Sequence, residues 1–415
     1  MGADTSAAAG WFPALGEPRV RRYLFGQGAS VMGSWVLDIT LNLLVWQLTR
    51  SPATLGLLNF LIYGPAVLVI PLLSLRLHAG NARSISLAVL WSALAVALGL
   101  AAAAVLDALT LPLLLVAAAL RGILGGLEVP SRLMLLTTIA ADANRMGSAI
   151  AMNTVVFLLA RTAGPGIAAL MFEPLGPAWA FGLAALGLMA MLRCVIGLRG
   201  AGLGPGAPAP TRGLGPAWDF VRQDGFASLL LPLLTSVGLT AGAYQTLVPV
   251  LADRVFGDAA RWIGWFFAAA GGGALVGAVL LSSRFMDVLL RRLLLLGPWL
   301  AVVGLVLIAA SRLPSVSLLG FALLGFCMSF IATGTSATMH RRVPAAARGG
   351  LIALFQLAFM GVVPFAQLFG GALAQWLSVR WAFGLLAALL FLATLVLCAR
   401  RWRRLGRLEF DASRL

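Results

Sequence analysis

The chain has 415 residues, of which 61% are hydrophobic and 11% are charged. Soluble domains contain about 45–50% apolar and about 25% charged residues, so this composition excludes a soluble domain of any size and indicates a surface solvated by lipid. The net charge of +16 does not indicate nucleic-acid binding, because the 30 basic residues separate apolar runs instead of gathering with aromatic residues on one face.

Twelve apolar runs are long enough to cross a bilayer, which takes about 20 residues. Six lie in the first half of the chain, at 22–48, 53–75, 84–106, 111–139, 146–171 and 177–198. Six lie in the second half, at 226–252, 260–283, 290–311, 315–339, 350–376 and 381–400. The chain is therefore predicted to be an all-α polytopic membrane protein with twelve transmembrane helices in two six-helix bundles.

The apolar runs also predict the domain boundaries. Between the halves, residues 200–215 are rich in Gly and Pro, which indicates a flexible linker. Residues 218–222 are predicted to form a short interfacial helix. A sequence echo between 72–77 and 280–285 indicates an internal repeat. The predicted parts are an N-terminal cytoplasmic tail (1–20), a first six-helix bundle (21–199) and a cytoplasmic linker (200–224). A second six-helix bundle (225–402) and a C-terminal cytoplasmic tail (403–415) follow.

The positions of the arginines predict the orientation of the chain. With both termini in the cytoplasm, 22 arginines fall on the cytoplasmic side, five on the outer side and three within spans. Cytoplasmic loops of membrane proteins carry an excess of basic residues, so we expect a multi-pass protein of a bacterial inner membrane with both ends inside.

Four segments carry a resemblance to a known family. They are Phe25–Asp38 with its continuation to Pro52, Arg121-Gly122, Gly164-Pro165 and the stretch from Val343 to Gly349 that includes Arg348. In order and spacing the chain resembles the major facilitator superfamily, and within it the exporter branch of macrolide efflux proteins and the enterobactin exporter. The resemblance implies alternating access, the two-bundle fold and a monomer. The kink at Gly164-Pro165 corresponds to a motif that marks exporters in that family.

One loop departs from the family pattern. The family has a Gly-x-x-x-Asp-Arg signature between spans two and three, where this chain has Ser74, His78 and Ala79 at the corresponding positions. The resemblance implies that this loop holds the cytoplasmic gate closed through charge pairs. We expect the gating residues to be Arg76, His78, Arg83, Arg284 and Arg348 together with Gly164 and Pro165; a drifted, solvated His78 is an equally good reading of the loop.

Five ionisable residues lie inside predicted spans, where a charge costs at least about 2.5–3.5 kcal/mol. Arg121, Glu128 and Arg132 share one face of span four, because they are seven and four residues apart. In the family fold spans one and four line the same cavity, so the resemblance implies a pair between Asp38 and Arg121. A nearby arginine favours the charged form of an acid, whereas loss of water favours the neutral form. The predicted proton-coupling or structural network is Asp38, Arg121, Glu128, Arg132 and Arg161.

Uncharged polar residues in the spans are candidates for the substrate cavity, although each is also a candidate for an ordinary helix-to-helix hydrogen bond. The set comprises Gln27, Asn42, Asn59, Asn153, Tyr244, Gln245, Ser329, Thr333, Thr335, Gln356 and Gln367.

The residues present favour transport over catalysis. The chain has two histidines and three cysteines, without an HExxH, GxSxG or CxxC motif, and we expect no enzyme activity, cofactor, metal site or disulfide. The first hypothesis is proton-coupled efflux of a drug-like or siderophore-like amphiphile. The alternatives are a facilitator or importer of the same fold, or a ferroportin-like metal exporter.

Overall fold

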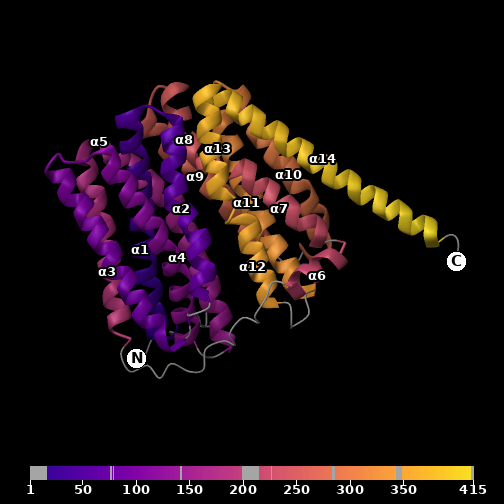
Figure 1. Ribbon diagram of the computed structural model, residues 1–415, viewed down its shortest axis with the longest axis horizontal. Helices are drawn as coiled ribbons and strands as arrows, with labels where there is room; N and C mark the ends of the chain where they lie inside the picture. The colour runs from indigo at the N-terminus through magenta and orange to yellow at the C-terminus, as the bar shows by residue number, and fades with distance from the viewer. Residues whose placement is uncertain are drawn as a thin grey trace, which may run out of the picture. The chain divides into compact units, whose positions relative to one another are not determined.

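The computed structural model describes residues 16–74, 77, 79–140, 143–198, 215–225, 227–282, 286–342 and 348–412 (Figure 1). All regular elements in these ranges are helices, which confirms the all-α prediction. Ten helical stretches in these ranges are long and apolar enough to cross a membrane; one of them, Met146–Ile196, contains two predicted spans, and Leu294–Ala310 is a shorter apolar helix. Arg76, His78 and Arg284 lie outside the described residues, and for Arg348 only the backbone is described.

The first half of the chain, in the part that the structure describes, forms five helices. Helix α5 is 54 residues long but contains the fifth and sixth predicted spans, because Gly176 interrupts it with φ 73° and ψ 176°. Glycine adopts this positive φ without the penalty that a side chain would bring, and the prolines on either side, Pro174 and Pro177, also disfavour a continuous helix. The helices are α1 Pro18–Thr49, α2 Pro52–Ser74, α3 Ala79–Val105, α4 Leu111–Ile139 and α5 Ala143–Ile196.

The described residues of the second half form nine helices, and two predicted spans are interrupted within them. The seventh span is divided between α7 and α8 near Gly242, and the eleventh between α12 and α13 near Gly361. A side chain at Gly361 would meet the carbonyl oxygen of Leu357 at 2.6 Å, so this turn requires glycine. The helices are α6 Gly215–Gln223, α7 Ala227–Ala241, α8 Tyr244–Arg254, α9 Ala259–Ser282, α10 Met286–Ala310, α11 Pro314–Arg342, α12 Arg348–Phe359, α13 Val363–Trp376 and α14 Val379–Ala412.

The helices group into two compact units. The first contains α1, most of α2, α3, α4, α5 and the beginning of α9, and the second contains the remaining helices. In the first unit α1 packs along α5, and the close approach depends on glycine: a Cβ at Gly33 would lie 2.8 Å from the Cα of Ala184. Small residues allow helix backbones to approach in this way. The domain boundaries predicted from sequence stay a prediction.

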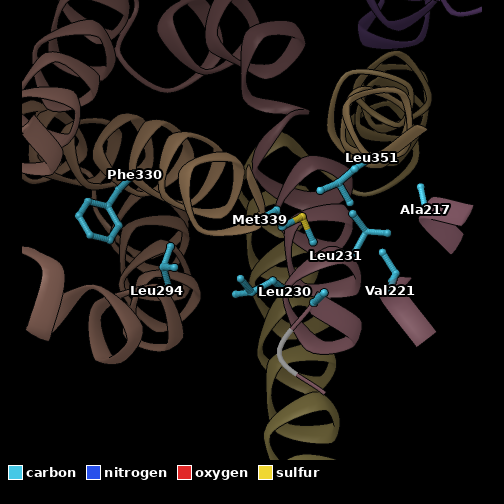
Figure 2. Packing of buried hydrophobic residues seen from close by; sticks show 9 residues of the cluster. Ala217, Val221, Leu230, Leu231, Leu294, Phe330, Met339 and Leu351 are labelled. Atoms are coloured by element: carbon cyan, nitrogen blue, oxygen red, sulfur yellow. The ribbon is translucent and has the colours of Figure 1, made fainter. Parts of the chain in front are cut away.

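The short helix α6 is present at the expected place and packs against other helices of the second unit. Its buried residues Ala217 and Val221 join an apolar cluster with Leu230, Leu231 and Leu351 (Figure 2). Trp218 and Arg222 lie on the same helix, with the guanidinium carbon 5.2 Å from the ring centroid. The face of α6 with Ala217 and Val221 is therefore buried against the protein, whereas Trp218 and Arg222 are exposed.

In each unit an arginine donates hydrogen bonds to the last carbonyl groups of a neighbouring helix. Arg83, near the start of α3, donates hydrogen bonds to the carbonyl oxygens of Val195 and Ile196 at the end of α5, at 3.2 and 3.1 Å. Arg380, at the start of α14, donates in the same way to the last carbonyls of α10, with Nε 2.8 Å from the oxygen of Ala309. The last carbonyls of a helix have no partner within it, and a cation at this end is favoured by the helix dipole.

Candidate functional site

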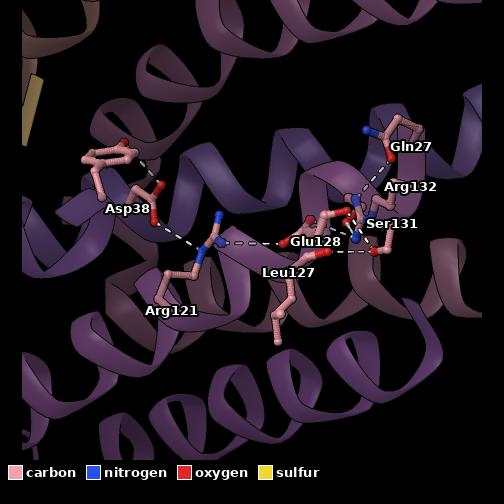
Figure 3. A network of polar contacts seen from close by, with 9 residues as sticks. Gln27, Asp38, Arg121, Leu127, Glu128, Ser131 and Arg132 are labelled. Atoms are coloured by element: carbon pink, nitrogen blue, oxygen red, sulfur yellow. Dashed lines mark hydrogen bonds and ion pairs between the residues drawn. The ribbon is translucent and has the colours of Figure 1, made fainter. Parts of the chain in front are cut away.

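The ionisable residues of α1 and α4 form a line of alternating charge inside the first unit (Figure 3). Arg121 lies 3.5 Å from a carboxylate oxygen of Asp38 and 3.5 Å from one of Glu128, and Glu128 lies 2.9 Å from Arg132. Asp38, Glu128 and Arg132 are all buried. The expected pair between Asp38 and Arg121 and the i,i+4 pair between Glu128 and Arg132 are both found; the role of these residues in transport stays a proposal.

The Arg132 end of the line is held tightly. Besides its ion pair with Glu128, the guanidinium donates to Gln27 at 3.0 Å and to Ser30 at 2.9 Å, both on α1. The hydroxyl of Tyr23 donates to the backbone carbonyl of Arg132 at 2.7 Å. Charge-assisted hydrogen bonds of this length are strong, so this end fixes α4 against α1. Gln27, expected in the substrate cavity, is one of its anchors.

The Asp38 end of the line is loose. Its ion pair with Arg121 is 3.5 Å long, and the hydroxyl of Tyr63 reaches the second carboxylate oxygen only at 3.5 Å. Among the described residues, Oδ1 of Asp38 accepts no hydrogen bond. A buried carboxylate with so few close donors is poorly stabilised in its charged form. The line of charges therefore has several close contacts at its Arg132 end and few at its Asp38 end.

Two glycines on α4 set the position of the loose end. A Cβ at Gly122 would lie 2.9 Å from Cδ of Pro65 and 3.0 Å from the oxygen of Ile62, both on α2. A Cβ at Gly126 would lie 2.9 Å from Cβ of Val69. This small-xxx-small spacing brings α2 and α4 into backbone contact. Since Arg121 directly precedes Gly122, the contact also fixes where its side chain begins.

A small cavity adjoins the centre of the network. It measures about 20 Å³ and touches Arg121, Glu128 and Ser34, with apolar side chains of α1, α3, α4 and α5 forming the rest of its wall. About 10–15 Å³ is enough for one water molecule when polar partners are at hand. The site can therefore hold a water that bridges the two charged groups.

Arg161, the fifth predicted member, lies beside a tryptophan on α1. Its guanidinium carbon is 5.9 Å from the ring centroid of Trp35, within the range of a cation–π interaction. Phe157, one turn earlier on α5, meets the same ring edge-on with centroids 6.4 Å apart. Gly164 permits the approach, because a Cβ there would lie 2.6 Å from that of Trp35. Gly164 and Pro165 are buried within α5.

Asn42 and Asn59 are buried and hydrogen-bonded to each other. Nδ2 of Asn59 donates to Oδ1 of Asn42 at 2.7 Å, and Nδ2 of Asn42 donates to the backbone oxygen of Asp38 at 2.8 Å. The pair thus ties α2 to the turn of α1 that carries Asp38. Asn153 is partly exposed on α5.

The polar candidates of the second unit are less concentrated. Nε2 of Gln367 on α13 donates to Oε1 of Gln245 on α8 at 2.8 Å. Tyr244 is buried against Phe321, with ring centroids 6.2 Å apart. The remaining candidates differ in exposure: Ser329 is partly exposed, Thr333 and Gln356 are exposed, and Thr335 is buried. Their assignment to a substrate cavity stays a prediction.

Sequence reasoning missed the tyrosines of the network. The chain contains three tyrosines, and two of them, Tyr23 and Tyr63, contact Arg132 and Asp38. A hydroxyl inside an apolar span usually has a hydrogen-bond partner, and this was the signal that could have identified them.

Membrane-length apolar helices that enclose a buried network of paired charges are typical of membrane transport proteins. The family described as transmembrane secretion effector matches residues 17–414. The chain therefore belongs to this family, and it is a multi-pass membrane transporter of the major facilitator type. No curated protein sequence shows a significant match.

Solved structures confirm the fold. The nucleoside transporter NupG superposes with a TM-score of 0.67 at 12% identity, over 92% of this chain and 99% of NupG. A bacterial homolog of the human lysosomal transporter Spinster gives 0.68 at 13% identity, over 93% and 97% of the two chains. A peptide transporter of the POT family gives 0.68 at 16% identity, over 94% and 95%. At these identities the likeness establishes the major facilitator fold alone.

Proposed function

We propose that the protein exports an amphiphilic small molecule, drug-like or siderophore-like, in exchange for protons. It works as a monomer by alternating access in a bacterial inner membrane, with both termini in the cytoplasm. The observation that carries the proposal is the buried line of charges in α1 and α4, fixed at Arg132 and loose at Asp38.

The loose end supplies a physical basis for proton coupling. Two unit charges about 4 Å apart attract by about 4 kcal/mol at an effective dielectric constant of 20. A proton that binds Asp38 removes this attraction and leaves Arg121 paired with Glu128 alone, 3.5 Å away. The tie between α1 and α4 then weakens at one end while Arg132 keeps the other in place. Binding and release of one proton can thus alternate the packing of the two helices.

Two features favour export over import. The family match is to a transmembrane secretion effector, and α5 carries the Gly164-Pro165 pair in its interior, at the position of the exporter motif. The orientation with both termini in the cytoplasm rests separately on the 22 arginines predicted on that side against five on the other.

The test compares Asp38→Asn with wild-type protein in proteoliposomes. Cargo is first chosen as a fluorescent amphiphile whose accumulation in an efflux-deficient strain falls when the protein is expressed. An imposed pH gradient should drive uphill transport of that amphiphile by wild-type protein and proton counterflow reported by an internal pH dye. Because asparagine binds no proton, the rate of uphill transport by Asp38→Asn should be at least about tenfold lower than that of wild type. The variant should still exchange labelled for unlabelled cargo.

Glu173→Gln is the matched control, since it removes an exposed acid of the same helical unit outside the network. It should transport like wild type. Uphill transport by Asp38→Asn with an unchanged pH dependence would refute the coupling role of Asp38. Wild-type transport that follows only the cargo gradient would instead identify a facilitator. Uphill uptake of the cargo into whole cells would identify an importer.

A further inference from the structure

Arg161 lies deep within the membrane-spanning part of α5. It lies 18 residues after the start of α5 at Ala143 and 15 residues before the break at Gly176. At 1.5 Å per residue these distances are about 27 and 22 Å, so the side chain lies near the middle of a bilayer about 30 Å thick.

The exposure of Arg161 indicates what it faces. The residue is partly exposed, and a charged side chain in contact with lipid at this depth costs at least about 2.5–3.5 kcal/mol. Charged residues in the middle of spans therefore face the protein interior or a water-filled path. Phe157, one turn earlier on α5, is 42% exposed. The two side chains therefore lie on the same accessible face of α5.

The surroundings of Arg161 combine a cation with an apolar platform. The guanidinium lies over the ring of Trp35, and the edge-on contact of Phe157 continues the aromatic surface. Met32, partly buried, packs against Trp35 and Ala160 in the same apolar cluster. A cation next to two aromatic rings and a thioether suits a ligand with a negatively charged group on an apolar body.

The charge balance of the spans points to the same ligand chemistry. Among the described residues of the first unit, the interior of the spans carries three arginines and two carboxylates, a formal excess of one positive charge: Asp38, Arg121, Glu128, Arg132 and Arg161. In the described spans of the second unit, acidic side chains, arginines and histidine lie only near the ends. A bound monoanion would neutralise the excess. Each negative charge expelled also gains about 2.3 kcal/mol per 100 mV of an interior-negative potential.

We propose that Arg161, Trp35 and Phe157 form the subsite that receives the anionic group of the exported amphiphile. The inference rests on the proposed function for the direction of transport. The binding step itself is independent of the proton gradient. The cargo class is a carboxylate, sulfonate or comparable monoanion attached to an aromatic or aliphatic body.

The first experiment measures water access and local charge without a known cargo. Cys194, Cys327 and Cys398 are replaced by serine, and Phe157→Cys is introduced in that background. The cysteine is labelled with an anionic methanethiosulfonate, the ethylsulfonate, and with a cationic one, the ethyltrimethylammonium compound. We expect the anionic reagent to react about tenfold faster relative to a free thiol standard, as an electropositive cleft produces.

Arg161→Gln should abolish this preference, and Arg161→Lys should retain most of it. Arg222→Gln is the matched control, because it removes an arginine that also lies over a tryptophan, Trp218, outside the spans. Equal rates for the two reagents, a preference unaffected by Arg161→Gln, or absence of labelling would overturn the proposal. Asn153→Cys, one turn away, gives the same readout if Phe157→Cys does not fold.

The second experiment measures binding of a matched pair of probes to protein in nanodiscs. Dansyl-leucine carries a carboxylate, and dansyl-leucinamide is its neutral counterpart; energy transfer from tryptophan reports both. We expect dansyl-leucine to bind about tenfold tighter than the amide, and Arg161→Gln to equalise them. Equal binding by wild-type protein overturns the subsite. Loss of proton-driven transport with this discrimination intact would refute the proposed function and leave the subsite standing.

Discussion

Gly122→Ala tests whether the close approach of α2 and α4 positions the charge network. The added methyl group would lie 2.9 Å from Cδ of Pro65 and 3.0 Å from the oxygen of Ile62, and the carbonyl of Leu61 is nearer still. Carbon atoms pack best at about 3.5–4.0 Å, so α4 must move away from α2 by at least about 0.5 Å.

The movement has two measurable consequences. Overpacking of this kind costs about 1–3 kcal/mol, and the midpoint of thermal unfolding in detergent, followed by tryptophan fluorescence, should fall by about 2 °C or more. The ion pair between Arg121 and Asp38 on α1 is already 3.5 Å long, so a shift of α4 by about 0.5 Å changes its geometry close to the 4 Å limit of a paired contact. The rate of proton-coupled transport should therefore fall even at temperatures well below the thermal midpoint, where the variant is still folded.

Gly99→Ala is the control, because nothing lies within 4 Å of a Cβ built at this position of α3. It should leave the thermal midpoint and the transport rate unchanged. If Gly122→Ala matches this control in both measurements, the helices accommodate the methyl group freely and the glycine does not position Arg121.

Two further predictions concern hydrogen bonds away from the ion pairs. Arg83→Gln removes the donors that close α5 and should lower stability by at least about 1 kcal/mol, seen as a lower thermal midpoint; an unchanged midpoint would mean that water replaces the contact. Asn42→Leu or Asn59→Leu alone leaves a buried amide unsatisfied and should cost about 1–3 kcal/mol, whereas the double variant should cost less than the sum. Additive losses in this cycle would contradict the pairing.

The sequence was sufficient to predict the helical class and most of the span positions. Apolar runs and arginine positions report which residues are in lipid, and this requirement is nearly independent of how the helices pack. The interruptions of spans seven and eleven were not predicted, because Gly242 and Gly361 each lie inside a single apolar run of about the length of one span, 226–252 and 350–376. A glycine inside a span marks either close packing or a turn, and the composition does not distinguish them.

The charge network was partly predictable for a different reason. Spacing along one helix placed Arg121, Glu128 and Arg132 on one face, whereas the partner Asp38 came from the family resemblance. The pair formed by Asn42 and Asn59 could not be derived, because it depends on how α1 and α2 are rotated about their axes. The same limitation hid the contact between Arg161 and its tryptophan.

The arginines that close helix ends bear on the history of the two halves. Arg83 begins span three and closes span six, whereas Arg380 begins span twelve and closes span nine. In a six-plus-six repeat, three corresponds to nine and six to twelve, so the same two helices are joined in each half. The joints lie at opposite ends of the pair, however, and the donor comes from the non-equivalent helix. A single contact copied by a duplication would occupy the same end in both halves, so these two contacts are not copies of one another.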